Sequence, residues 1–383
     1  MKTVLLVFGT RPEAIKMAPV VAALRARADE LRTVVAVTGQ HRAMLDQVLA
    51  AFGLAPDIDL DLMRPGQSPN DVAARLLERT PPVLRETGAD VVVVQGDTTS
   101  AMAAGLAAFH ERVPVAHVEA GLRSGRMDSP FPEEMNRVVL DKLSTWLFPP
   151  TQAADDALAA EGVAADQRLV TGNTSIDALL TLRERVGTMD LATRERFEGC
   201  KRLVLVTLHR RESFGAPLAG LLDALQELAR RHPDVDFVYP VHPNPAVHGP
   251  AHATLKADNL HLLEPLPYPD LVWLLDRAEL TLTDSGGIQE EAPALGTPVL
   301  ILRDVTERPE VVSGGAGLLL GTDRETVVDA AHRWLADPST AASFRQPRLL
   351  FGDGHAGARI AAMLAGERPA PFVASTDTAG AGA

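Results

Sequence analysis

The sequence has little of what several large protein classes require. It contains a single cysteine, Cys200, so no disulfide can form within the chain, and no metal-ligand spacing surrounds that residue. Lys and Arg number 37 against 50 Asp and Glu, giving a formal net charge of -13. This balance argues against a nucleic-acid backbone as the main partner, because tracking phosphates requires clustered cations. The lone cysteine favours a reducing compartment.

Targeting and membrane signals are also missing. No apolar stretch approaches the roughly 18 residues that a membrane span needs. The N-terminal apolar run stops at Gly9 and Arg11 follows, which is too short for a signal peptide. We therefore expect a cytoplasmic protein that binds no membrane.

Cofactor signals are equally scarce. There is no Gly-x-x-x-x-Gly-Lys-Ser/Thr loop, and no Gly-x-Gly-x-x-Gly fingerprint follows an expected strand, which argues against an ATP-driven step and a bound NAD. His248 and His252 have helical spacing, but Gly249-Pro250 lies between them and no acidic ligand accompanies them, so we predict no metal site. We expect no cofactor.

The chain does contain alternating short apolar runs and longer amphipathic stretches, which predict βαβ units and a buried parallel sheet. Its 383 residues, 46% of them apolar, suggest two domains at roughly 150 residues each. The expected strands form two series, 4–8, 33–38, 91–95, 115–118 and 146–148, then 203–208, 237–240, 260–263, 280–283, 299–302 and 318–320. We predict an α/β protein with two Rossmann-like lobes.

The lobes are expected to meet near Gly172–Ala178. This gives an N-terminal lobe of residues 1–174, onto which a helix at 353–366 packs back, and a C-terminal lobe of residues 175–352. The last segment, 367–383, is rich in Ala, Gly, Ser, Thr and Pro, and we predict that it is disordered.

Ligands of open parallel sheets bind beyond the carboxyl ends of the strands. There, Thr283-Asp284-Ser285-Gly286-Gly287 offers a hydroxyl and unobstructed N–H groups at a helix start, which suits a pyrophosphate. Glu290 and Glu291 follow one turn later, where one carboxylate could accept ribose hydroxyls. After the first strand, Arg11 and Lys16 could hold an anion, although an ordinary turn with solvated charges fits these two residues equally well.

Three carboxylates, Asp97, Glu119 and Glu133, occupy strand ends or a helix start in the first lobe. Together they outline an acid/base site, although each alone could be a cap or a solvated group. In the second lobe, His209 ends a strand beside two arginines and could meet a diphosphate as donor or general acid; the alternative is a capping histidine.

Eight blocks resemble the non-hydrolysing UDP-N-acetylglucosamine 2-epimerases, in order and over roughly residues 1–365. They are FGTRPEAIKMAP, QGDTTS, HVEAGLRSG, SPFPEEMNR, TGNTSIDAL, HRRESFG, TDSGGIQEEAPALGTPVL and RDVTERPE. The resemblance implies a GT-B-type fold with the active site in the interlobe cleft and UDP bound by the C-terminal lobe. It also implies a homodimer and reversible conversion of UDP-GlcNAc to UDP-ManNAc.

The family's residue types are present at all of its main functional positions in this chain: Arg11, Lys16, Asp97, Glu119, Glu133, His209, Ser285, Gly286, Gly287, Glu291 and Arg308. The chain departs from the family beside the uracil, where Leu266 and Leu271 replace a pattern that often includes Phe. Some relatives bind a second UDP-GlcNAc as an activator, and this resemblance extends to Gln40, His41, Gln67 and His242. Ala43 and Gly66 replace polar residues that some of those relatives use.

The implied chemistry explains these residue types. The C2 hydrogen of GlcNAc has no adjacent carbonyl, so expelling UDP from C1 to form 2-acetamidoglucal is one route to its removal, and UDP then returns. Three alternatives share parts of this site: a hydrolysing epimerase, a GT-B glycosyltransferase and a catalytically silent sugar-nucleotide sensor. The acids favour epimerisation, and the sequence blocks favour the non-hydrolysing branch.

Overall fold

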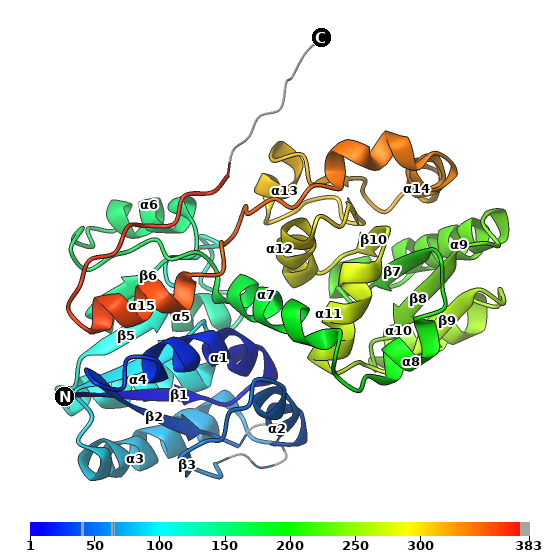
Figure 1. Cartoon of the computed structure of the whole chain (residues 1–383). Helices are drawn as coiled ribbons and strands as arrows, with labels where there is room; N and C mark the ends of the chain where they lie inside the picture. Colours follow the sequence, from blue (N-terminus) through cyan, green and yellow to red (C-terminus); the bar gives the residue numbers. More distant parts are fainter. Residues whose placement is uncertain (40–41, 63, 65, 376–383) are drawn as a thin grey trace. The chain divides into compact units, whose positions relative to one another are not determined.

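The computed structural model describes residues 1–39, 42–62, 64 and 66–375, and Figure 1 shows the course of the chain. The described chain divides into two compact units. Unit 1 comprises Met1–Thr181 together with Phe351–Ala374, and unit 2 comprises Leu182–Leu350 and, of the described residues, also Ser375.

Unit 1 is built on a parallel sheet with strand order β3-β2-β1-β4-β5-β6. Its strands are β1 (Lys2–Phe8), β2 (Leu31–Val37), β3 (Ile58–Asp59), β4 (Val91–Gln95), β5 (Val115–Val118) and β6 (Trp146–Phe148). Side chains alternate along β1, so Val4 and Leu6 enter one core while Leu5 and Val7 enter the other. Both faces of the sheet are therefore buried, as the continuous apolar runs predicted.

Helices cover both faces of this sheet. The first core contains side chains of α1 (Arg11–Arg25), α2 (Arg42–Ala51) and α15 (Ala356–Leu364). The second contains side chains of α3 (Pro69–Thr87), α4 (Thr99–His110) and α5 (Glu133–Leu143). Two further helices follow β6, namely α6 (Gln152–Ala160) and α7 (Thr174–Val186).

Unit 2 repeats the architecture with strand order β12-β11-β10-β7-β8-β9. Its strands are β7 (Leu203–Thr207), β8 (Asp236–Pro240), β9 (Leu260–Leu263), β10 (Leu280–Thr283), β11 (Val299–Ile301) and β12 (Gly317–Leu319). One core joins the sheet to α9 (Ala216–Arg231), α10 (Pro245–Thr254) and α14 (Arg324–Ala336). Outside that core, α11 (Tyr268–Arg277) and α12 (Gly286–Leu295) pack against β7 and β10. The shorter elements are α8 (Ala192–Phe197), α13 (Pro309–Ser313) and the 3₁₀ turns η1 (Arg211–Ser213) and η2 (Pro338–Phe344).

Both sheets have the doubly wound order in which the direction of winding reverses at a central strand pair. The reversal falls between β1 and β4 in unit 1 and between β7 and β10 in unit 2. Ligands of such sheets bind outside the carboxyl ends of these pairs, where the connecting helices diverge. The candidate site residues must therefore be sought in the turns after these strands.

The predicted fold class is confirmed, and every expected strand is present with its ends shifted by one or two residues at most. The helix start predicted at Glu133 is confirmed as well, since α5 begins there. Strand β3 was not predicted because two residues give no periodic signal. None of the helices in the described ranges is long and apolar enough to cross a bilayer.

Helix α15 lies against α1 in unit 1, although the sequence separates the two helices widely (Figure 1). The segment Gly352–Gly357 that leads into α15 has the spacing Gly-x-Gly-x-x-Gly, but η2 and a loop precede it instead of a strand. A Cβ at Gly357 would come 2.7 Å from the carbonyl oxygen of Pro19. That glycine therefore serves close helix packing, and the segment is not a dinucleotide fingerprint.

The segment predicted to be a disordered tail differs from the prediction over its first part. Residues 367–375 are described, and Phe372 is only 5% exposed, with its N–H donating to Val170 O at 2.8 Å. The Arg359 guanidinium lies 5.9 Å from the centroid of the Phe372 ring. One aromatic side chain thus fixes a segment whose composition resembles that of a linker. Residues 376–383 lie outside the described residues.

Asp177 of α7 is a buried carboxyl that fastens the start of α15. Its Oδ1 accepts the Gly357 N–H at 2.8 Å, whereas its buried Oδ2 has no hydrogen-bond partner. Burial raises the pKa of Asp177 from 3.8 to about 6. The folded protein therefore binds a proton more tightly than the unfolded chain does, and the resulting stabilisation is present below pH 4 and lost as the pH rises through 6.

We expect Asp177→Asn to remove this pH dependence. The free energy of unfolding of the variant, relative to wild type, should rise by about 2 kcal/mol between pH 4 and pH 7, because most of a shift of about two pKa units is expressed in that range. Denaturant titrations of both proteins at the two pH values measure this difference. An equal difference at both pH values would show that Asp177 titrates normally in the folded protein.

Candidate functional site

The turn after β1 is built around Glu13, a buried carboxylate in the first turn of α1. Thr10 caps this helix, and Glu13 accepts the N–H groups of Gly9 and Thr10 at 3.0 and 2.7 Å. Glu13 also accepts the hydroxyl of Thr98 at 2.7 Å, which joins the turn after β1 to the turn after β4. This contact fixes the two turns at the reversal point of unit 1. Arg11 opens α1 at the same place.

Glu119 follows β5 directly and has a left-handed backbone with φ of 67°. Such a conformation is uncommon outside glycine and is concentrated at functional sites. Lys16 Nζ lies 2.7 and 2.6 Å from the two carboxylate oxygens, and the Gln95 amide also donates to Glu119. Two predicted site residues, Lys16 and Glu119, are thus in direct contact, and their donors hold the carboxylate in one orientation.

Asp97 follows β4 and is engaged by two residues of α5. The Asn136 amide donates to the Asp97 carbonyl at 2.9 Å, and the Arg137 guanidinium forms an ion pair with the Asp97 carboxylate. Glu133 is the first residue of α5 and is half-buried, and it shares a helix face with Arg137 at i,i+4 spacing. Arg137 therefore brings Asp97 to the helix face that bears Glu133.

In unit 2, the buried Asp284 organises the turns after β7 and β10. Its carboxylate accepts the N–H groups of His209 and Arg210, with shortest distances of 2.8 and 2.9 Å. The Nδ1 atom of His209 lies 3.1 Å from Asp284 Oδ1. A carboxylate can only accept, so this contact favours a proton on Nδ1, and Nε2 is the ring nitrogen directed away from Asp284; it can donate to an anion when both ring nitrogens are protonated.

Ser285 and Gly286 form the start of α12. Ser285 is the N-cap residue, and its N–H donates to the Thr283 hydroxyl at 2.9 Å. A Cβ at Gly286 would come 3.2 Å from Arg210 Nη2, so a guanidinium lies against the glycine that opens the helix. Positive charge and helix N–H groups therefore occur together here, as an anion requires.

The acids of α12 have different partners. The Tyr268 hydroxyl donates to Glu291 Oε1 at 2.9 Å, while Glu290 forms an ion pair with Arg308 at the start of α13. Of the two residues predicted beside the uracil, Leu266 lies in the loop before α11 and Leu271 in the first turn of that helix, both half-buried.

The four residues linked to activator binding fall in different places. Gln40 and His41 lie outside the described residues. In unit 1, the Gln67 amide donates to Leu62 O at 3.2 Å and its oxygen accepts the Arg64 N–H, so Gln67 closes its own loop. In unit 2, His242 stacks on His209 with ring centroids 5.8 Å apart and planes 19° apart.

Sequence reasoning missed several residues that hold these turns in place, chiefly Glu13, Gln95, Asn136 and Arg137. A signal existed for two of them. Gln95 is the one polar residue in a strand that is otherwise four valines, and Arg137 lies one helical turn after Glu133. The sequence does not reveal the other partners, because their contacts join turns that only the folded sheet brings together.

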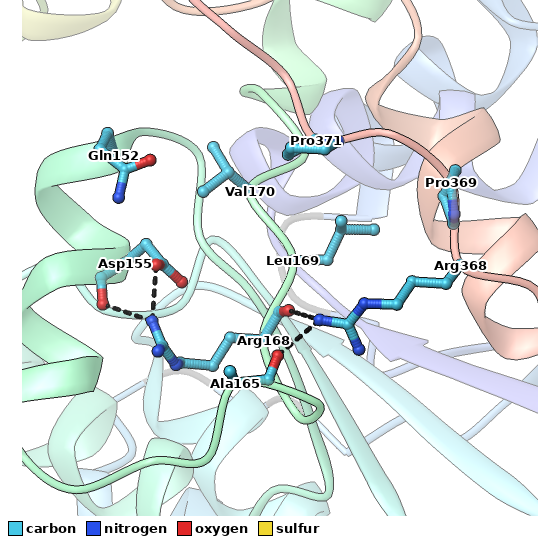
Figure 2. Close-up of a pocket in the computed structure, with 9 residues that line it drawn as sticks. All are labelled: Gln152, Asp155, Ala165, Arg168, Leu169, Val170, Arg368, Pro369 and Pro371. Atoms are coloured by element: carbon cyan, nitrogen blue, oxygen red, sulfur yellow. Dashed lines mark hydrogen bonds and ion pairs between the residues drawn. The ribbon is translucent and has the colours of Figure 1, made fainter.

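Two hollows elsewhere in the units contain none of the predicted site residues. The hollow in Figure 2 has a volume of about 250 Å³ and lies between α6 and the segment after α15. Its polar groups pair with each other: Arg168 with Asp155 at 2.5 Å, and Arg368 with the carbonyl oxygen of Ala165 at 2.6 Å. The other hollow, of about 330 Å³, lies beside Trp334 of α14. Across the described ranges, no group of three or more His, Cys, Asp or Glu side chains could hold a metal ion.

Comparisons with known proteins give a consistent result. A family model described as UDP-N-acetylglucosamine 2-epimerase matches residues 22–365. The Yersinia pestis protein named UDP-N-acetylglucosamine 2-epimerase is 51% identical over 364 residues, which cover 93% of this chain and 96% of that protein.

Solved structures resemble this chain over nearly its whole length. The UDP-GlcNAc 2-epimerase from Neisseria meningitidis bound to UDP-GlcNAc superposes with a TM-score of 0.86 and 40% identity, covering 94% of this chain and 99% of that one. The S. aureus MnaA–UDP co-structure gives a TM-score of 0.85 and 39% identity, covering 97% and 100%.

Proposed function

This chain belongs to the UDP-N-acetylglucosamine 2-epimerase family, and from that premise we propose that it interconverts UDP-N-acetylglucosamine and UDP-N-acetylmannosamine without net hydrolysis. The observation that carries the proposal is the division of chemical groups between the two units. Carboxylates follow β4 and β5 in unit 1, and an anion-binding helix start with a histidine follows β10 and β7 in unit 2.

The proposed reaction removes and returns a proton at C2 of the sugar. A base takes the C2 proton while the C1–O bond breaks, and the electron pair of that bond leaves with UDP. The C2–H electron pair forms the C1=C2 double bond of 2-acetamidoglucal. A proton then adds to the opposite face of C2 as a UDP oxygen attacks C1, so atoms and charge balance and no redox partner takes part.

The groups of unit 2 suit the departing diphosphate. We assign the β-phosphate to the Ser285–Gly287 N–H groups, His209 Nε2 and Arg308, with Arg11 of unit 1 as a further cation. Each well-placed donor to a developing anion contributes about 2.7–4 kcal/mol. We place the ribose on Glu291 and the uracil beside Leu266 and Leu271.

The carboxylates of unit 1 suit the proton transfers. Glu119 is held by Lys16 and Gln95, and Asp97 by Arg137, so both are oriented before substrate arrives. We assign removal and return of the C2 proton to Asp97, Glu119 and Glu133, which can act from opposite faces of one ring. Each well-placed acid or base typically contributes about 10²–10⁴-fold.

Incubation with UDP-GlcNAc in D₂O tests this proposal by NMR. We expect both UDP-sugars to appear, each with deuterium at C2, and no steady accumulation of free sugar. Accumulating free N-acetylmannosamine with UDP would instead show a hydrolysing enzyme. Absence of exchange at C2 would exclude epimerisation by this route and favour a transferase or a sensor.

A further inference from the structure

A buried ion pair in unit 1, His117 of β5 with Asp141 of α5, is not used by the proposed chemistry. The His117 side chain is 0% exposed and Asp141 is 2% exposed. His117 Nδ1 lies 2.6 Å from Asp141 Oδ1, and His117 Nε2 lies 2.8 Å from the carbonyl oxygen of Gly96. Both ring nitrogens are therefore occupied by oxygen acceptors.

These contacts fix the protonation state of His117. A backbone carbonyl has no proton to donate, so Nε2 must carry one. Asp141 Oδ2 accepts the Gly121 N–H at 3.1 Å and pairs with Arg123 at 2.7 Å, which keeps Asp141 a carboxylate. The Nδ1 atom must then carry a proton too. His117 is thus an imidazolium cation, buried and paired with an anion.

The charges around the pair support this assignment. Arg123 also pairs with Glu161 at 2.6 Å, and Lys142 pairs with Glu161 at 3.2 Å, so the cluster alternates in sign. Burial opposes ionisation of Asp141, but His117 and Arg123 outweigh it and lower the pKa of that carboxyl below its ordinary value.

The pair contacts every segment that carries one of the three proposed acids. Gly96 immediately precedes Asp97, and its carbonyl accepts from His117. Gly121 lies two residues after Glu119, and its N–H donates to Asp141. Asp141 itself lies two turns after Glu133 in α5. Gly121 is tightly confined as well, since a Cβ there would come 2.3 Å from the carbonyl oxygen of Ala154.

We propose that His117 and Asp141 form a positioning pair that sets the relative placement of Asp97, Glu119 and Glu133 for proton transfer at C2. The inference rests on the proposed function of those acids. A neutral side chain at either position satisfies at most part of the network. The acid-bearing turns then shift, while the nucleotide-binding turns of unit 2 keep their own contacts around Asp284.

Two variants and one spectroscopic measurement test this. His117→Gln can donate to only one of the two acceptors, and Asp141→Asn keeps the shape but removes the anion. Both should lower kcat by about 10- to 50-fold, because misplacement of catalytic groups by a fraction of an ångström is costly. The Kd for UDP, measured by calorimetry, should stay within about twofold of wild type. Loss of folding alone would reduce kcat and the number of UDP sites together.

The matched control is His232→Gln, which removes a buried histidine of unit 2 whose ring hydrogen-bonds to His332. It should keep the wild-type kcat. In ¹⁵N NMR spectra, both His117 nitrogens should be protonated in wild type, and one proton should be lost in Asp141→Asn. This readout needs no turnover and applies even if one variant fails to fold.

A neutral His117 in wild type, or wild-type kcat in both variants, would overturn the inference. These outcomes are distinct from failure of the proposed function. If wild type itself shows no exchange at C2 in D₂O, the assignment of the acids fails. If wild type epimerises and both variants match it, only the positioning role fails.

Discussion

Replacing Glu119 with glutamine is expected to lower kcat for epimerisation by about 10²–10⁴-fold. The amide keeps the volume of the side chain but cannot accept a proton from C2. It also places an NH₂ group or a neutral oxygen against Lys16 Nζ, where the carboxylate now makes contacts of 2.6 and 2.7 Å. Initial rates of UDP-ManNAc formation measure the effect, and deuterium incorporation at C2 shows whether proton removal is the step that is lost.

Glu78→Gln is the control for this change, since Glu78 is an exposed glutamate of α3 in the same unit. It should match wild type in rate. Because the groups proposed to bind UDP, apart from Arg11, belong to unit 2, Glu119→Gln should also bind UDP normally by calorimetry. A rate within about tenfold of wild type would remove Glu119 from the acid/base role, because even weak general catalysis contributes more than that.

The fold was predictable because the strands of a doubly wound sheet are buried on both faces and appear as short apolar runs between longer amphipathic segments. Val91–Gln95 and Leu203–Thr207 show this clearly. The exceptions have physical causes. Strand β3 is too short to have a period, and the burial of Phe372 depends on a surface that the rest of unit 1 creates.

The positions of candidate site residues were predictable for a related reason: parallel strands end at one edge, so residues after them gather there. The residues that contact them were not predictable. Gln95 meets Glu119 because β4 and β5 pair with Gln95 opposite Val118, and nothing in either segment alone specifies that register. The roles assigned to Asp97, Glu119 and Glu133 stay predictions until variants are assayed.

A polar residue inside an apolar strand is a further sequence signal of a specific buried contact, and the predictions drew little on it. His117 interrupts the buried strand Val115–Val118, and its paired nitrogens could not be foreseen without the position of α5. The adjacent acids Glu133 and Glu134 also differ in their burial. Glu134 is buried and accepts the Ser124 N–H at 3.0 Å, whereas Glu133 remains half-buried at the start of the helix. Both acids lie in the first turn of α5, so their spacing does not distinguish them.

His209 is the unit 2 residue whose loss should matter most. Asp284 contacts its Nδ1, so the doubly protonated ring presents the Nε2–H, and the side chain is 38% exposed in a turn beside the start of α12. In the proposed reaction, negative charge grows on the β-phosphate as UDP leaves, and a donor placed at that point stabilises the transition state more than the ground state. Arg210 lies against Gly286 and adds positive charge at the same helix start.

We expect His209→Asn to lower kcat/KM for UDP-GlcNAc by about 10²–10³-fold, the cost of losing one donor to a developing anion. Asparagine can still bond to Asp284 but is too short to present a donor where Nε2 lies. The UDP formed should also escape more often, so free UDP and glycal should rise relative to UDP-ManNAc in NMR time courses. His248→Asn, which changes a histidine of α10 outside the proposed site, should leave both quantities unchanged. An unaltered kcat/KM in His209→Asn would show that the diphosphate is held without this ring.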